Sequence, residues 1–543
     1  MLEPLTMKAV IALALQNNGD IKVNGLSKII ENEKIKAAKL AFDLQLNGSY
    51  NYQSIDSPQN AQDYVATGGG AASLTNLAQP ILTQPQIFEQ RNHTAKVALT
   101  QKLVTGTTLE FGTTSRVLDN TLNRRLPPSM FSPEWETFTG LTVTQPLLRD
   151  FGIAANTAEI RIAKSNAKMA DFEWQSRTAQ VVSAVMKAYY DVVFTLENTK
   201  VQQDSIGLAQ KLMDDTMARS KEGLAATNDV SVAEAGVYQR KEDALTAEMQ
   251  YVERQSALQL LFKTSSAVIA QGSRIQPVDR LSSVVPETRR AELMATAMER
   301  RYEILQADES IAIKSAQVDY ATSQSRPRLD LVSSGGFHGL SGAAGRSYDR
   351  AANGQGPEWT AGVQFSMPLD WDHLQSTRRA AEEGRTQAHV QRGDTKLRVA
   401  LEVDTVLSRL RTDEQRLVAS RKSREAAALS ADGGLKRFIE GVTTSFEVLQ
   451  LQKDFARARS REYAALADLN KDVVDLQLVT GTLLDQQGVI MLGNEAKLQK
   501  FPHEQTVKIG QDRDSKDGEA EVEPVAPAPS PLKRRSMSVF KRN

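Results

Sequence analysis

Residues 182–196 read VSAVMKAYYDVVFTL, and residues 399–410 read VALEVDTVLSRL. In both stretches apolar side chains recur at alternating spacings of three and four residues, which is typical of the seam of a coiled-coil helix. The two patterns coincide at one constant offset of 218 residues (403 minus 185), and Gly223 and Gly441, which interrupt them, are separated by the same offset. The sequence therefore predicts an internal duplication of a long helical hairpin.

These helical patterns are too long for a globular core. The first runs from about Gly152 to about Lys263, and the second from about Pro368 to about Leu484. At about 1.5 Å per residue, the first arm of roughly 70 residues spans on the order of 100 Å. Either seam alone is also consistent with the core of an ordinary helical bundle. Such a bundle does not explain why strands of bilayer length occur beside both hairpins.

The segment before the first hairpin alternates with the period of a strand. Within residues 42–52, Leu44 and Leu46 stand on one side, and Gln45 and Asn47 stand on the other. A strand of about 11 residues is long enough to cross a bilayer when it is tilted. Similar strand signals recur at 97–99, 109–111, 141–145, 329–337 and 363–367, and the Gly-rich stretches 54–93 and 339–356 are expected to be exposed loops.

Composition and charge exclude several classes of protein. The 66 basic and 66 acidic residues of this 543-residue chain give a formal net charge of +0, so nucleic acid is not an expected partner. The absence of cysteine excludes disulfides, zinc ribbons and thiol catalysis. No run of about 18 apolar residues predicts a transmembrane helix, and Met1–Thr6 lack the features of a secretory signal, so we expect either that the protein is cytosolic or that this chain lacks its leader.

The sequence offers little support for an enzyme, and we predict no cofactor. The five histidines are scattered, without the helical spacing of a zinc protease. Asp370, Asp372 and His373 form the tightest acid and imidazole cluster, but capping of the following helix explains these aspartates more simply than a metal does. The glycines at 68–70 and 336–339 lack the strand-to-helix context of a phosphate-binding loop.

Several motifs, taken in order, resemble the outer membrane efflux proteins of the TolC type. The resemblance covers roughly residues 5–486, and its strength lies in the order, duplication and spacing of motifs that are each weak alone. The matching segments are the helix 5–21 with its Asn-Asn-x-Asp-Ile end, the corner Thr144-Gln145-Pro146-Leu147-Leu148, the hairpin tips 222–230 and 440–449, and the closing run 476–484.

This resemblance implies an α+β membrane protein located in the outer membrane and extending into the periplasm. A duplicated strand hairpin and long α-helical hairpin would build a homotrimeric β-barrel in outer-membrane lipid, continued by an α-helical coiled-coil barrel. The expected partners are a periplasmic adaptor protein and an inner-membrane transporter. The expected function is that of a passive channel-tunnel of a tripartite efflux or type I secretion system, which exports solutes across the periplasm and outer membrane.

We expect seven segments along the chain. They are N-terminal helices (1–41), a first outer-membrane strand region (42–147), a first long hairpin (148–271), an equatorial linker and helix (272–325), a second strand region (326–369), a second long hairpin (370–486) and a disordered tail (487–543). The strand pair within 97–113 is additional to the simplest members of the family, so it either widens the barrel or lies elsewhere.

The resemblance also predicts a periplasmic gate at the hairpin tips. Glu447 holds the position of a carboxylate that projects into the lumen, and Asp229, its first-hairpin counterpart, is expected to form hydrogen bonds within the protomer. Gln450 stands where a second carboxylate is expected, and Phe438 and Thr443 stand where tyrosine and arginine serve in some members. The alternative for Glu447 is a solvated charge near a helix cap.

A different class of protein remains as the rival interpretation. A coiled-coil scaffold or interaction protein without membrane contact would account for the helical hairpins. It would have no use for the alternating strands at 42–52 and 329–337. A hydrolase is disfavoured because the sequence offers no site for it.

Overall fold

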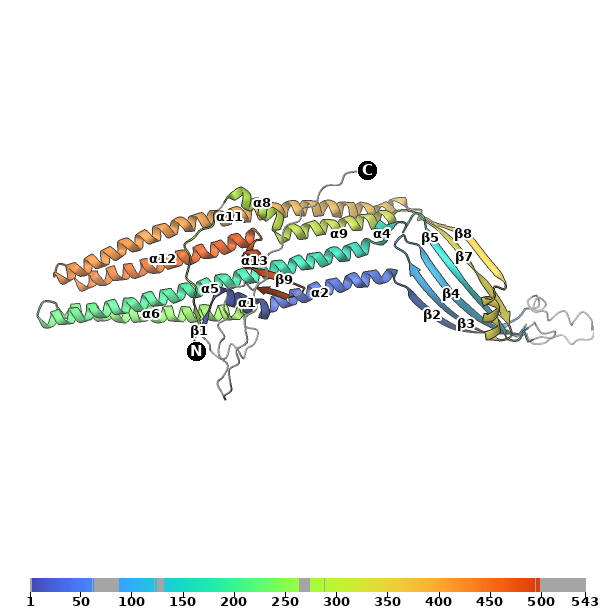
Figure 1. Cartoon of the computed structure of the whole chain (residues 1–543), viewed down its shortest axis with the longest axis horizontal. Helices are drawn as coiled ribbons and strands as arrows, with labels where there is room; N and C mark the ends of the chain where they lie inside the picture. The colour runs from blue at the N-terminus through green and yellow to red at the C-terminus, as the bar shows by residue number, and fades with distance from the viewer. Residues whose placement is uncertain are drawn as a thin grey trace, which may run out of the picture. The chain divides into compact units, whose positions relative to one another are not determined.

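The computed structural model describes residues 2–60, 62, 87–121, 123–124, 131–262, 274–287, 289–493 and 495–498. The chain divides into the units Met1–Gln499 and Lys500–Asn543, and all described residues belong to the first. Within this unit, long helices continue into a β-sheet at one end (Figure 1).

The sheet has six antiparallel strands in the order β2-β3-β4-β5-β7-β8. The additional strand pair is β3 and β4, so it lies inside this sheet and separates β2 from β5. The two edge strands, β2 and β8, are exposed along their whole length. The strands are β2 (Gln45–Pro58), β3 (Ile87–Lys102), β4 (Thr108–Asn120), β5 (Glu134–Pro146), β7 (Arg328–Ser341) and β8 (Pro357–Ser366).

The helical part consists of two equivalent hairpins, which confirms the predicted duplication. The hairpins are α5–α6 and α11–α12, and the ends of α5 and α11 and the starts of α6 and α12 are each 218 residues apart (439 minus 221; 445 minus 227). Within the described residues, no helix is both long enough and apolar enough to cross a membrane. The helices are α1 (Met7–Asn17), α2 (Gly19–Lys39), α4 (Ile153–Asn156), α5 (Ala158–Lys221), α6 (Thr227–Phe262), α8 (Arg290–Arg300), α9 (Tyr302–Gln324), α11 (Trp371–Ile439), α12 (Ser445–Val479) and α13 (Leu483–Gln486).

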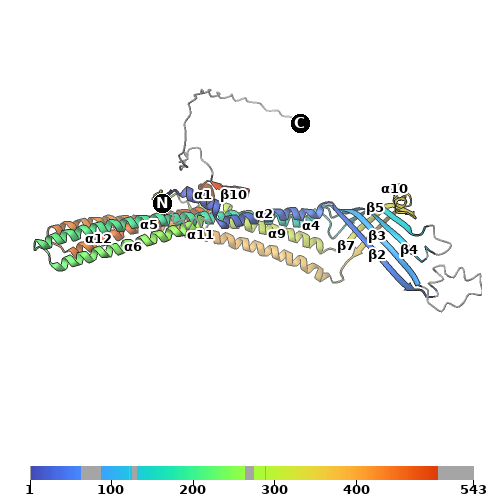
Figure 2. The same ribbon diagram turned by 90° about the horizontal axis from the view of Figure 1, so that it is seen from below.

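Four helices lie side by side at each level of the helical part. Away from the sheet the order is α11, α12, α5, α6, and near the sheet it is α11, α9, α5, α2 (Figures 1 and 2). Helices α5 and α11 run through both levels. The outer helices of this layer are therefore α11 on one edge, and α6 and α2 on the other.

The predicted seams form the core of each hairpin. Val185 and Tyr189 are fully buried in a cluster with α1 and α6, and Val403 and Leu410 are buried in the equivalent cluster with α8 and α12. Burial of apolar side chains contributes about 25 cal/mol to the free energy of unfolding for each Å² of apolar surface removed from water. Both halves of the duplication therefore have a core of their own at the same level.

Short strands surround the middle of the helices. Strand β1 (Leu2–Leu5) pairs in parallel with β6 (Arg274–Pro277), and the hydroxyl of Tyr189 donates hydrogen bonds to the Leu5 carbonyl and to Oδ2 of Asp279, both at 3.0 Å. Burial raises the pKa of Tyr189, so the hydroxyl keeps its proton and remains a donor. These contacts attach the N-terminus to α5.

The structure corrects four expectations. Leu5 belongs to β1 rather than to a helix, and the first sheet strand begins at Gln45, after a 3₁₀ turn at Leu40–Phe42. The stretch expected as a loop at 339–356 contains helix α10 (Ala344–Ala352), because its Ser347 and Ala351 pack on the sheet. Strands bordering the loop expected at 54–93 extend to Pro58 and start again at Ile87, and most of the remainder lies outside the described residues.

The C-terminal segment is ordered further than predicted. Strands β9 (Val489–Leu492) and β10 (Glu495–Leu498) form a hairpin, although a disordered tail was expected from residue 487. Val489 and Ala496 are buried in the core beside α1. This burial of apolar side chains explains why the hairpin is ordered, and the expected tail beyond it lies outside the described residues.

Candidate functional site at the hairpin tips and the sheet

Both hairpin tips turn through the same backbone geometry. Gly223 and Gly441 have φ values of 77° and 79°, a region that side chains rarely adopt. The next residue in each turn closes it, because Leu224 donates its N–H to the Arg219 carbonyl at 2.8 Å, and Val442 donates to that of Arg437 at 2.9 Å. The two glycines therefore allow α5 and α11 to end sharply.

An apolar cluster joins the two hairpins just behind the tips. Phe438, a predicted gate residue, is 5% exposed and belongs to this cluster. Its side chain therefore serves packing rather than polar closure of the tip. The cluster consists of Ala209, Leu212, Val237, Phe438, Val448 and Leu449, so both hairpins contribute to it.

Two arginines of the first hairpin bind backbone carbonyls of the second. Arg219 donates to the carbonyl oxygens of Phe438 (2.6 Å) and Ile439 (2.5 Å), and its guanidinium lies 4.7 Å from the centre of the Phe438 ring. Arg240, whose side chain is 5% exposed, donates to the Leu449 carbonyl at 3.2 Å. A cation at the C-terminal carbonyls of α11 is also favoured by the helix dipole, so Arg219 links the tips both by hydrogen bonds and by charge.

Glu447 is part of a small network within the second tip. Its Oε1 accepts a hydrogen bond from Arg437 at 3.2 Å, and its Oε2 accepts one from the hydroxyl of Thr443. Its backbone N–H donates to Oγ1 of Thr444, the N-cap of α12, at 3.3 Å. The Glu447 side chain is nevertheless 50% exposed, so its carboxylate keeps access to solvent.

The other predicted gate residues lie apart from this network. Oδ2 of Asp229 accepts from the N–H of Ala226 at 3.2 Å and so caps the start of α6, and the Asp229 carbonyl accepts from Ser445 at 3.5 Å. Gln450 donates to Asp454, one turn further along α12. The structure thus brings Glu447 and Thr443 together and leaves Asp229, Gln450 and Phe438 in separate surroundings.

Sequence reasoning missed Arg219 and Arg240. A signal for Arg219 was present, because Arg219 and Arg437 have the same offset of 218 residues as the two tip glycines (437 minus 219). The duplicated arginines make different contacts, since Arg219 reaches across to α11 and Arg437 pairs with Glu447. No comparable signal marks Arg240.

The sheet has one apolar and one polar face, which confirms the predicted alternation. Strand pairing aligns two adjacent rows of side chains that cross all six strands on opposite faces. The apolar row is Leu46, Leu99, Phe111, Leu141, Gly335 and Trp359, and the polar row is Gln45, Thr100, Glu110, Thr142, Ser334 and Thr360.

Exposure and charge follow this division. On the apolar face, Leu46 is 72% exposed and Trp359 is 79% exposed, although water disfavours such surface. The polar face carries ion pairs between neighbouring strands, Lys96 with Glu110 and Arg116 with Glu136, each at 2.6 Å, and His338 with Glu358. One face therefore suits lipid and the other suits an aqueous lumen.

A buried carboxyl group, Asp472, lies beside the partly exposed Asp413 in the second hairpin, at the level of its core. Asp472 is 3% exposed, and burial raises its pKa to about 7, with the neighbouring Asp413 carboxyl adding to the shift. Arg409 lies 3.7 Å from Asp472 Oδ1 and opposes it. Asp472 therefore holds its proton to a higher pH than an ordinary aspartate does.

Potential metal ligands are dispersed in the part of the chain that the structure describes. No group of three or more potential ligands is close enough there to hold a metal ion. In the Asp370–His373 cluster, the carboxylate of Asp372 accepts a hydrogen bond from Arg379 at 2.5 Å.

Comparison with known proteins finds a consistent set of similarities in sequence. Residues 293–482 match the family described as outer membrane efflux proteins. Nodulation protein T of Rhizobium leguminosarum bv. viciae is 23% identical over 340 residues, which are 61% of this chain and 67% of that protein. The outer membrane protein TolC of Vibrio cholerae serotype O1 is 22% identical over 359 residues, 64% of this chain and 77% of that protein.

Solved structures show the same fold. The crystal structure of the Campylobacter jejuni CmeC outer membrane channel matches with a TM-score of 0.61 and 15% identity, covering 88% of this chain and 86% of that chain. The resemblance that the motifs predicted is therefore confirmed in sequence and in fold.

Proposed function

We propose that this chain, a relative of the TolC-type outer membrane efflux proteins, is the outer membrane channel of an export system. The observation that carries the proposal is the two-faced sheet joined to helices too long for a globular core. The coiled-coil scaffold considered as a rival offers no reason for a sheet with an exposed apolar face. The matched family transports solutes rather than transforming them, so the channel has no catalytic role.

The exposed edges of the sheet support closure between copies. Strands β2 and β8 each have one unpaired edge, and an unpaired edge in lipid leaves backbone groups without hydrogen-bond partners. Pairing of β8 with β2 of the next copy removes every edge. Three copies give eighteen strands, a size at which barrels retain an aqueous channel.

The helical layer supports the same closure. On the edge helix α6, Leu245 and Met249 are 69% and 55% exposed, and on the opposite edge helix α11, Val418 and Leu429 are 58% and 75% exposed. Nearer the sheet, Leu26 of α2 is exposed in the same way. Packing α6 and α2 of one copy against α11 of the next buries these stripes and turns the layer into a tunnel.

The remaining parts follow from this assembly. The barrel lies in outer-membrane lipid and the helices extend into the periplasm, where a periplasmic adaptor and an inner-membrane transporter supply the substrate and the energy. Glu447 at the tip lines the narrow end and attracts cations. Arg219 and the Glu447 network hold the tip in place until a partner acts on it.

A matched pair of substitutions in one strand tests the proposal. Leu141→Arg places a charge on the apolar face, which costs about 2–4 kcal/mol per copy at the middle of a bilayer. Thr142→Arg places the same charge on the polar face, one residue along β5. We expect Leu141→Arg to abolish assembly in outer membranes, and Thr142→Arg to assemble and form channels of lower cation preference in planar bilayers.

The outcome separates the two classes of protein. A coiled-coil scaffold would tolerate both arginines equally and would form no channels. Equal, full assembly of both variants would therefore overturn the proposed function.

A further inference from the structure

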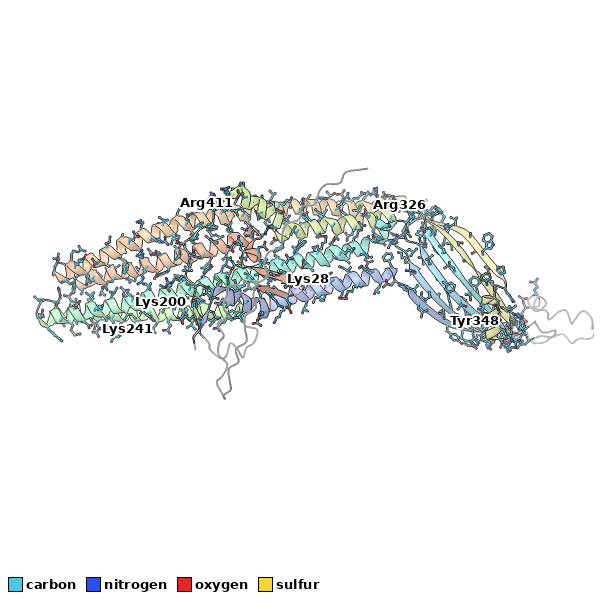
Figure 3. All side chains as sticks on the ribbon, in the orientation of Figure 1. Lys28, Lys200, Lys241, Arg326, Tyr348 and Arg411 are labelled. Carbon is cyan, nitrogen blue, oxygen red and sulfur yellow. The ribbon has the colours of Figure 1, made fainter. Side chains whose placement is uncertain are left out.

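Helix α10 lies on the apolar face of the sheet, beside β5 and β7. Its Ser347 is fully buried, and its Oγ lies within hydrogen-bonding distance of Oγ1 of Thr137 (2.9 Å) and of the Gly339 carbonyl (2.7 Å). Thr137 and Gly339 are paired residues on the face that also carries Leu141. Figure 2 shows α10 against β5, and the Tyr348 label in Figure 3 marks the end of the sheet away from the helices.

Helix α10 lies at the level along β7 at which a membrane boundary is expected. The apolar face of β7 begins at Leu329, ten residues before Gly339. Ten strand residues span roughly 33 Å, and a tilt of about 40° reduces this to roughly 25 Å across the bilayer, the height of an outer-membrane apolar band. The row at the level of Gly339 contains Tyr50, and the next row contains Tyr52 and Trp135, which are residue types that favour the interface.

The exposed side of α10 carries two arginines and one carboxylate, Asp349, and so has a net positive charge. Arg346 and Arg350 are exposed and stand one helical turn apart. Arg350 is oriented by a hydrogen bond to the Leu340 carbonyl and lies 5.9 Å from the centre of the Phe131 ring. Arg346 takes part in no hydrogen bond or ion pair with the residues that the structure describes, so its guanidinium is available to a ligand.

A cavity of about 490 Å³ opens on the same face beside the helix. Ser115 lines it and pairs with Thr137, the residue that Ser347 binds. Aromatic and small side chains dominate the walls, and the one carboxylate, Asp119, accepts a hydrogen bond from Arg124 at 2.8 Å. The lining residues are Tyr50, His93, Ala95, Ser115, Val117, Asp119, Pro133 and Trp135.

We infer that α10 and this cavity bind the phosphate-bearing headgroup of a lipid in the outer leaflet. Arg346 and Arg350 contact the phosphate, and the aromatic wall at Tyr50 and Trp135 accommodates the adjoining apolar part of the lipid. The inference rests on the proposed function, because it requires the apolar face to lie in a membrane. It assigns to α10 a role in fixing the barrel at its outer boundary.

The test measures lipid retention by the purified full-length assembly in mild detergent. Phosphatidylglycerol and phosphatidylcholine are titrated against the wild type, Arg346→Ala and Arg411→Ala, and bound lipid is counted by native mass spectrometry. Arg411 is an exposed arginine on α11, away from the sheet (Figure 3), and serves as the matched control. We expect Arg346→Ala to lower the affinity for phosphatidylglycerol about fivefold, the factor that roughly 1 kcal/mol per arginine represents.

Two further measurements make the result decisive. Inorganic phosphate is added as a competitor, and every variant is recorded in planar bilayers. Three outcomes would each overturn the lipid site while channels persist. They are retention of phosphatidylglycerol with no preference over phosphatidylcholine, an equal loss of phosphatidylglycerol affinity in both variants, and complete displacement of the lipid by millimolar inorganic phosphate. Absence of channels in the wild type would instead overturn the proposed function, and the lipid site with it.

Discussion

At the scale of single residues, Glu447 carries a half-exposed carboxylate at the second tip. We predict that Glu447→Gln weakens the cation preference of the channel and relieves its block by multivalent cations, because three carboxylates in a narrow throat create a site that water screens poorly. Planar-bilayer recording provides the measurement. Asp229→Asn is the control, since Asp229 caps α6 within its own hairpin, and equal behaviour of the two variants would contradict a carboxylate ring.

A second prediction at this scale concerns Asp472 and pH. Its pKa is raised to about 7, above the ordinary value of 3.8, so the folded protein binds a proton that the unfolded chain has released between these two pH values. The contribution of Asp472 to the free energy of unfolding is therefore fully present below about pH 4. This contribution is lost as the pH rises through about 7. Asp472→Asn keeps the shape of the side chain and should flatten the fall in melting temperature between pH 5 and pH 8.

The surroundings of Asp472 sharpen the test. Asp413 and Asp475 oppose its ionisation and Arg409 favours it, so Asp475→Asn, which removes the weakest of these influences, is a suitable control. A slope unchanged in Asp472→Asn would show that another group titrates in this range.

The resemblance to the family indicated part of the tip. Glu447 was identified by its position directly after the second tip. Its ion pair with Arg437 forms because the turn brings these two residues, ten positions apart, close together. The bonds of Arg219 and Arg240 to backbone carbonyls could not be predicted, because any residue supplies a carbonyl and only the packing of two hairpins decides which one is within reach. Burial of Phe438 depends on the same packing.

At the scale of elements, Arg219 is one of the side chains that join the two hairpins near their tips. Arg219 donates two hydrogen bonds to the end of α11 and stacks on Phe438. We predict that Arg219→Gln speeds amide hydrogen exchange in the last turn of α11 and raises channel conductance, because the tips separate more readily. Arg219→Lys keeps the positive charge but loses the planar guanidinium that reaches two carbonyls, so its exchange rates and conductance should lie between those of wild type and Arg219→Gln. Exchange rates equal to wild type in both would exclude this role.

Periodicity predicted the long elements and failed for the short ones. Helices α5 and α11 and the alternation of β2 and β7 follow from patterns sustained over many residues. Helix α10 has only nine residues and packs through Ser347 and Ala351, which are small and carry no apolar signal. The hairpin β9–β10 is ordered by tertiary burial of Val489 and Ala496, which short sequence windows do not reveal.

At the scale of the whole molecule, the duplication explains why the chain has two exposed edges. Each half provides one long through-running helix with its shorter partners, and joining the halves leaves α6 and α2 at one edge and α11 at the other. The two halves differ in the sheet, where β3 and β4 occur only in the first. A repeated unit with complementary edges closes most simply into a ring.

The last prediction tests this ring at its helical interface. Leu245 and Met249 of α6 are one helical turn apart and exposed, and burial of a leucine against α11 of the next copy contributes about 2 kcal/mol. Leu245→Glu combined with Met249→Glu places two carboxylates in each interface, so we expect the assembly in mild detergent to dissociate to single chains at dilutions at which the wild type remains trimeric. Gln239→Glu adds a charge to the same helix outside the apolar stripe, at another exposed position, and should leave the trimer intact. Mass measured by light scattering decides between the outcomes: a double variant as stably trimeric as Gln239→Glu would mean that the α6 stripe does not contact a neighbouring copy, and the tunnel would have to close through other helices.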